Sequence, residues 1–222
     1  MTMTQKIGWG LLALASVLAG ATPARAQVFS ADLMGGSAYN FPTPLTIRQS
    51  GFDDIHFTAH YDTKPFGPFA PYYSWRVAFW NAKHDRAWEV QQVHHRIFLE
   101  NTTPEVTAFA IHFGYNFFMA GRAWRMHGFM LHTDFGVLVP NPANTVRGLS
   151  INIGPNAVHT GYSLSGVGGQ IAISRQLDLF KHFHVLADGG LMLGHTTVPV
   201  VTGNASVPNV SLHGRLGFGV SF

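Results

Sequence analysis

The 222-residue chain contains no cysteine, 11% charged residues and 13% aromatic residues. The lack of cysteine excludes disulfides and zinc–cysteine sites, and a typical soluble domain has roughly 25% charged residues. The 24 glycines and 18 phenylalanines, at a hydrophobic fraction of only 46%, are typical of a membrane β-barrel, whose apolar residues are spread along alternating strands.

Residues 1–26 are predicted to be a secretory signal peptide. Lys6 gives a positive start, residues 8–21 form an apolar run, and the small-residue sequence ARA ends the segment. This run is shorter than the about 20 apolar residues that a membrane-spanning helix needs, so we expect cleavage after residue 26. Without Lys6 and Arg25 the chain keeps 12 of its 14 basic residues against 11 acidic ones. A near-neutral mature chain predicts no nucleic-acid partner.

Residues 27–52 contain two prolines and show no clear period, so they are predicted to be an N-terminal extension, either a periplasmic lead-in or a plug. Residues 53–222 are predicted to form a barrel. No run of 18 uncharged apolar residues follows the signal peptide. An exported chain that crosses a membrane without such a helix must do so as a closed barrel.

Alternation of apolar and polar residues predicts eight strands. Their ranges are 53–62, 72–80, 87–100, 106–118, 124–139, 161–175, 182–195 and 210–222. The clearest is the fourth, which is expected to place Phe109, Ile111, Phe113, Tyr115 and Phe117 on one face. The connections alternate between long and short, as they do in outer-membrane barrels with both termini in the periplasm. The fold class is therefore all-β, an eight-stranded antiparallel transmembrane up-and-down β-barrel.

Glycine and alanine fall mostly on the polar face of these strands, and bulky apolar residues fall on the other. Small and polar residues inside, with bulky apolar residues outside, suit a narrow barrel in lipid. This pattern predicts a polar lumen filled by side chains. The alternative is a soluble lipocalin-like barrel, in which the bulky apolar residues would point inward.

The last strand carries Leu216, Phe218 and Val220 at alternate positions and ends on Phe222. This ending resembles the carboxy-terminal signature of bacterial outer-membrane proteins, and the chain resembles the small OmpA-type barrels. That superfamily includes lipid A palmitoyltransferase and lipid A deacylase. The resemblance implies an outer-membrane location, contact with its lipids and lipopolysaccharide, and recognition of Phe222 by the barrel-insertion machinery. It does not specify an activity, because one fold hosts many functions.

Titratable residues on the predicted inner face form a candidate lumen network. They are His60, Asp62, Arg76, Arg96, Glu100 and His213. We expect Arg96 to pair with Glu100 and Arg76 with Asp62, because an unpaired charge inside a barrel is costly. Such a network favours a structural role, or a role in binding small solutes or the cell surface.

The alternative function is a lipid A-modifying hydrolase or acyltransferase. His132 and Asp134 are expected to point the same way near the outer rim, as base and orienting carboxylate, with Ser74 or Ser163 as the nucleophile. The His-Ser dipeptide of the deacylase is absent from the chain, which disfavours that version. His60 could join His132 and Asp134 around a metal ion, but no second-shell residue supports such a site, so neither metal nor cofactor is predicted.

Overall fold

The computed structural model describes residues 28–66 and 71–222, and this part of the chain is built from antiparallel strands. The strands are β1 (Val28–Phe41), β2 (Thr43–Gln49), β3 (Ile55–Ala59), β4 (Tyr61–Asp62), β5 (Tyr73–Trp80), β6 (Arg86–Leu99), β7 (Val106–Met126), β8 (Phe129–Pro140), β9 (Ala143–Val146), β10 (Leu149–Ile151), β11 (Gly166–Asp178), β12 (Phe183–Val200) and β13 (Gly203–Ser221). No helix in the described residues could span a membrane. The predicted signal peptide, residues 1–26, lies outside the described residues.

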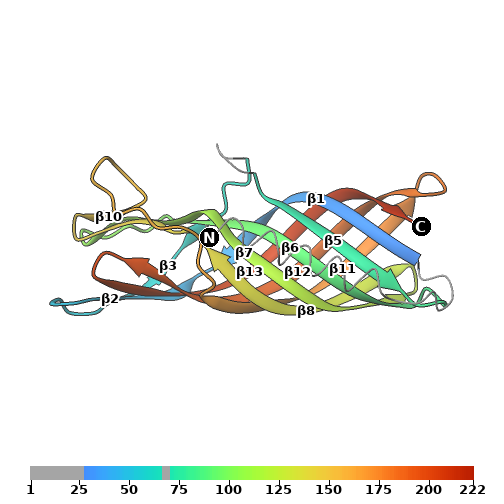
Figure 1. Cartoon of the computed structure of the whole chain (residues 1–222), viewed down its shortest axis with the longest axis horizontal. Coiled ribbons are helices and arrows are strands. Elements are labelled where there is room, and N and C mark those ends of the chain that lie inside the picture. The colour runs from blue at the N-terminus through green and yellow to red at the C-terminus, as the bar shows by residue number, and fades with distance from the viewer. Residues whose placement is uncertain (1–27, 67–70) are drawn as a thin grey trace, which may run out of the picture.

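Eight of these strands close into a ring, in the order β1, β5, β6, β7, β8, β11, β12 and β13 (Figure 1). Each pairs antiparallel with both neighbours, and β1 closes the ring on β13 from Ser30↔Ser221 to Phe41↔Val210. Closure pairs the backbone of every ring strand on both sides and leaves no open edge. The eight-stranded antiparallel barrel predicted from the sequence is confirmed.

The first strand of the ring differs from the prediction. It is β1, inside the segment 27–52 that the sequence indicated to be an extension, whereas the predicted first strand at 53–62 contributes β3 and β4 outside the ring. The inward residues of β1 include Ser30, Met34 and Asn40, which are buried. The glycine pair in its middle and a methionine on the inner face obscure the alternation that identifies a strand. The ring still has eight strands, because β1 takes the place of the strand predicted at 53–62.

The two ends of the barrel differ in their connections. The short turns at 81–85, 127–128 and 179–182 lie at one end, together with the carboxy terminus (Figure 1). Short turns face the periplasm in outer-membrane barrels, so we name this the periplasmic end. At the other end the barrel continues into an extension with two walls. In one wall β2 pairs with β13 and β3 pairs with β2, and in the other β9 pairs with β7 and β10 pairs with β9.

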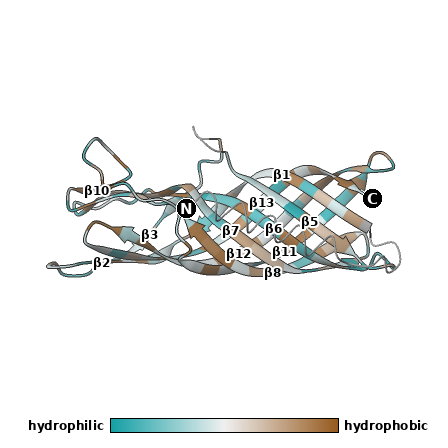
Figure 2. Ribbon diagram, in the orientation of Figure 1, coloured by the Kyte–Doolittle hydropathy of each residue, from teal (hydrophilic) through white to brown (hydrophobic). Residues whose placement is uncertain are grey.

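The outer face of the barrel is apolar along β8, β11, β12 and β13, as the alternation predicts. Phe135 is 68% exposed, Ile171 62% and Leu216 71%, while the preceding residue on each strand is buried. Figure 2 shows hydrophobic and hydrophilic residues alternating along these strands. Bulky side chains here face the position of the hydrocarbon.

Strand β7 departs from the prediction. Phe109, Ile111, Tyr115 and Phe117 were expected on the lipid-facing side, but all four are buried. On the part of β7 that follows Gly114, whose φ is +119°, the exposed aromatic residue is Phe118 and not Phe117. Alternation separates the two faces of a strand without indicating which one is inside, and the interior near this part of β7 is apolar.

The interior accordingly has two zones. The apolar zone fills the extension and the adjacent half of the barrel, and it includes Leu45, Ile47, Ile97, Ile111, Tyr115, Phe117, Leu138, Met192, Val198 and Val207. The half nearer the periplasmic end holds buried charged and polar side chains. The sequence predicted a polar lumen filled by side chains; in the described residues the buried side chains of the adjacent half are largely apolar.

Candidate functional site

A buried ion cluster lies in the polar half of the lumen. Asp188 on β12 accepts hydrogen bonds from Arg76 Nη2 at 2.8 Å and from Arg215 Nε at 2.7 Å. All three side chains are at most 2% exposed. The inward positions of β5, β12 and β13 bring them together across the barrel, and charges buried to this extent are stable only when paired.

A hydrogen-bonded chain adjoins this cluster. Glu89 on β6 lies 2.9 Å from His132 Nδ1, and His132 Nε2 lies 2.8 Å from the Ser174 hydroxyl. Arg76 Nη1 is also 3.3 Å from His132 Nε2. Carboxylate, imidazole and hydroxyl stand in the order and at the distances of a hydrolase relay. All three residues are buried, so the arrangement places the groups in sequence without showing a route for a substrate.

The predicted catalytic trio does not assemble. Asp134 accepts from Gln170 Nε2 at 2.6 Å, and its partner in the lumen is this amide. Ser74 is fully buried, and its hydroxyl has no hydrogen-bond partner among the described residues. The residues that contact His132 are Glu89 and Ser174 instead, and both were missed. Glu89 could have been found from the sequence, because it is an acidic residue at an inward position of β6.

His132 and Asp134 also lie at a different height from the one expected. The sequence placed the turn before β8 at 119–123, but the turn is at His127 and Gly128, whose φ angles are 52° and 83°. Two positive φ values define the two-residue type I′ hairpin turn. His132 is therefore close to the periplasmic end, not to the outer rim.

The predicted network residues divide between the lumen and the outer connections. His213 is buried, with Nδ1 2.6 Å from the Tyr72 hydroxyl and Nε2 2.8 Å from the Ser211 hydroxyl. Arg76 pairs with Asp188 and Glu89, so its predicted pairing with Asp62 is wrong.

The other four lie away from the lumen network. Asp62 on β4 accepts from the Thr63 amide at 2.7 Å. Arg96 Nε donates to the His112 carbonyl at 3.0 Å. His60 and Glu100 are exposed in the outer connections, which separates His60 from His132. No group of three potential metal-ligating residues converges anywhere in the described ranges.

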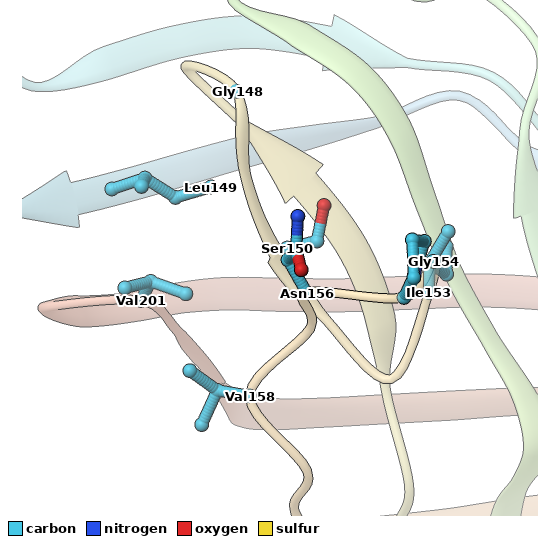
Figure 3. A pocket seen from close by; sticks show the side chains of 9 residues that line it. Gly148, Leu149, Ser150, Ile153, Gly154, Asn156, Val158 and Val201 are labelled. Carbon is cyan, nitrogen blue, oxygen red and sulfur yellow. The ribbon is translucent and has the colours of Figure 1, made fainter.

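A second candidate site is a pocket of about 340 Å³ at the far tip of the extension. Figure 3 shows Leu149, Val158 and Val201 around it, with Ser150 and Asn156 beside them. Leu149 is 40% exposed and Val158 is 52% exposed. The lining combines apolar side chains with polar atoms and is open to the surroundings, at the end of the molecule opposite the periplasmic turns.

The loop that forms this pocket is held by one side chain. Asn152 Nδ2 donates to the carbonyls of Pro142 and Thr160 at 2.8 and 3.1 Å, and its Oδ1 accepts from the Thr160 amide at 3.0 Å. Asn152 itself has φ of 53° and Gly154 has φ of 84°, a conformation that favours asparagine and glycine. The pocket is therefore built by specific contacts.

Comparison with known proteins identifies the fold. No family model and no curated protein matches the chain. The solved structures that match include outer membrane protein AlkL in lipid bilayers, with 12% identity, a TM-score of 0.52 and coverage of 91% of this chain and 95% of that one. Two others are the attachment invasion locus protein Ail of Yersinia pestis (11% identity, TM-score 0.41, 89% and 100% coverage) and the outer membrane protease OmpT of Escherichia coli (8%, 0.45, 91% and 100%).

At these identities the likeness concerns the fold alone. The ring of eight antiparallel strands and its apolar outer face agree with it. The described residues have the fold of an eight-stranded outer-membrane β-barrel.

Proposed function

We propose that the protein is a non-conducting outer-membrane anchor whose extension binds an apolar group of an extracellular ligand in the pocket of Figure 3. The observation that carries this proposal is a pocket at the end of the molecule farthest from the membrane, where Leu149, Val158 and Val201 present apolar side chains beside polar atoms. Its volume of about 340 Å³ lies in the range of small-ligand pockets.

Side chains that cross the interior support the non-conducting part. Tyr115 on β7 donates its hydroxyl to the Val207 carbonyl on β13 at 3.0 Å, and these strands are not neighbours in the ring. Arg76 reaches from β5 to Asp188 on β12 in the other half of the lumen. Eight-stranded barrels are just wide enough to be filled in this way. We expect no steady conductance from the purified protein in planar bilayers, and a stable open channel would contradict the proposal.

The extension supports the binding part, because it is a rigid stalk. Arg147 donates to Gln49 Oε1 at 3.2 Å and to the Asp53 carbonyl at 2.8 Å, which ties the wall of β9 and β10 to the wall of β2. Asn144 Nδ2 donates to the Pro199 carbonyl at 3.0 Å. These ties between the two walls fix the backbone that carries the pocket.

Methyl NMR in nanodiscs tests this site, with 1-octanol as the apolar probe. Saturable shifts are expected at the methyl groups of Leu149, Val158 and Val201. Leu149→Asp should remove them, because a carboxylate in the pocket disfavours an apolar guest. The matched control is Leu164→Asp, another exposed leucine outside the pocket. Shifts that persist in Leu149→Asp, or that vanish equally in both variants, would contradict the assignment.

The chain from Glu89 through His132 to Ser174 keeps a lipid A-modifying hydrolase as the second candidate. In that case Ser174 is the nucleophile, not Ser74. Mass spectrometry of lipid A from cells that carry the wild type, Ser174→Ala or no protein tests it. The binding proposal predicts the same lipid A in all three. A change of acylation that Ser174→Ala abolishes would establish the enzyme.

The proposal includes two steps of biogenesis. The signal peptide at 1–26 directs export, and the barrel-insertion machinery recognises Phe222. In the folded barrel the backbone amide of Phe222 donates to the Phe29 carbonyl at 2.8 Å, and its side chain is 65% exposed. The aromatic side chain stacks on His182, with ring centres 5.2 Å apart, and is not part of a buried core. Phe222→Ala should lower the amount of assembled barrel, and Phe222→Tyr should preserve it.

A further inference from the structure

Arginines and aromatic rings alternate on the outer face of the barrel near the periplasmic end. The Arg122 guanidinium lies 4.4 Å from the ring centre of Trp88, and the Arg175 guanidinium lies 5.4 Å from that of Phe129. Trp88 is 63% exposed. Aromatic residues in this position lie at the level of lipid headgroups. The rings hold the guanidinium groups at that level by cation–π contact.

The positive charge of this patch is not neutralised by the protein. None of the ion pairs within residues 28–66 and 71–222 involves Arg86, Arg122 or Arg175. Arg122 Nε is inaccessible to water and has no hydrogen-bond partner in that part of the chain. This nitrogen is out of reach of an external anion, so a phosphate would contact the terminal nitrogens of the guanidinium, which fit phosphate oxygens in a bidentate geometry. The unpaired charge of Arg122 therefore suits an anionic headgroup.

An apolar groove begins beside this patch. Thr133 pairs with Arg122 across β7 and β8 and also lines a groove of about 590 Å³ on the outer face of β8, β11, β12 and β13. Gly169 forms the floor between Phe135 and Leu193, its partners on the two neighbouring strands. The groove lies farther from the periplasmic turns than Arg122, at the depth of acyl chains. Missing side-chain volume in a lipid-facing wall must be filled by lipid.

We infer that Arg122, Trp88 and the groove over Gly169 bind one anionic phospholipid of the periplasmic leaflet. Its phosphate lies against Arg122, and one acyl chain lies in the groove between Phe135 and Leu193. The two observations are independent, since one concerns an unpaired positive charge and the other a shape. The register that places Thr133 next to Arg122 joins them into a single site for a molecule with an anionic head and an apolar tail.

Native mass spectrometry tests this site. The protein is released from detergent that contains equal amounts of phosphatidylglycerol and phosphatidylethanolamine. We expect one retained lipid, with phosphatidylglycerol preferred, and Arg122→Gln should lower its retention about fivefold or more. The matched control is Arg125→Gln on the same strand, where the arginine lies 4.8 Å from the ring centre of Trp80 but does not adjoin the groove. That control should retain the lipid.

The groove is tested separately by Ile171→Trp, which fills it without altering charge. Retention should fall for both lipids. Heat-modified migration on gels shows whether each variant is folded, and Arg122→Lys supplies a second, charge-conserving variant with intermediate retention. Equal loss of lipid retention in Arg122→Gln and Arg125→Gln would mean that any positive charge near this end attracts the lipid, and it would overturn the proposal. Retention unchanged in Arg122→Gln and Ile171→Trp would also overturn it.

Discussion

Asp188 is the residue on which the polar half of the lumen depends. It bridges two buried guanidinium groups, Arg76 and Arg215, that have no access to water. Removing one partner of a buried ion pair leaves an uncompensated charge in a low dielectric, which costs more than the pair itself contributes.

Asp188→Ala is therefore expected to destabilise the barrel by about 3–5 kcal/mol. The measurement is the temperature at which the compact band is lost on gels. Asp54→Ala is the control, because Asp54 makes an exposed pair with Arg48 at 3.1 Å. Exposed pairs contribute about 0–1 kcal/mol. Equal melting of the two variants would show that the lumen is hydrated and the cluster is not buried.

Phe117 and Phe135 test which aromatic face is internal. Phe117 is buried, and a Cβ on Gly168 would lie only 2.5 Å from its ring, so the ring packs directly against the wall. Phe117→Ala should cost about 3–5 kcal/mol through the cavity it leaves. Phe135→Ala should cost much less, because lipid replaces the lost contacts. Unfolding in urea from bilayers measures both, and the reverse order would contradict the inward orientation of Phe117.

At the scale of elements, the extension is stabilised by its own apolar core. Ile47 on β2 is fully buried, whereas Arg48, the next residue, is exposed. The extension and the ring are continuous through β13, but the extension has no hydrocarbon around it. Its packing therefore depends on side chains from the two walls.

Ile47→Asp is expected to open the extension and leave the ring intact. Whole cells treated with protease should show cleavage between β2 and β3, while the compact gel band of the remaining barrel persists. Arg48→Asp on the same strand should resist cleavage as the wild type does. Loss of the compact band in Ile47→Asp would mean that the extension and the ring unfold as one unit.

The elements show what alternation can and cannot predict. It located β5 and β6 to within one residue at each end, because each has bulky residues on one face and small or polar residues on the other. It found β8, β11, β12 and β13 as well, but it set the turn before β8 at 119–123 instead of 127–128, and it ended β12 at 195 instead of 200 and began β13 at 210 instead of 203. It missed β1, where glycine and methionine blur the two faces, and it assigned the wrong face of β7 to lipid. Phe109 and Phe117 face a protein core, and the sequence pattern of a strand facing a core matches that of a strand facing hydrocarbon.

The candidate site was harder to predict for a related reason. The inward direction of His132, Asp134 and Arg76 follows from strand parity. Their partners depend on the stagger between strands. The turn before β8 lies at His127, and with this register Glu89 and Ser174 lie against His132. The pocket of Figure 3 depends on one loop conformation held by Asn152, and no periodic pattern encodes it.

For the molecule as a whole, we infer a division along the long axis. The barrel lies in the bilayer, with an ion-paired interior near the short turns and an apolar interior in its other half, and the extension projects from the membrane around the same apolar interior. Strand β13 runs from the extension into the barrel, so labels at two positions on this one strand test both parts. The chain has no cysteine, so single cysteines can be introduced for labelling without altering native thiols.

Spin labels at Leu216→Cys and Asn204→Cys, in the protein reconstituted in bilayers, test this division most directly. Both residues are exposed on β13, one in each half. Power-saturation EPR should find the label at 216 more accessible to oxygen than to a water-soluble nickel chelate, and the label at 204 the reverse. Greater accessibility to the nickel chelate at both positions would contradict the account, because it would place the apolar face of the barrel in water.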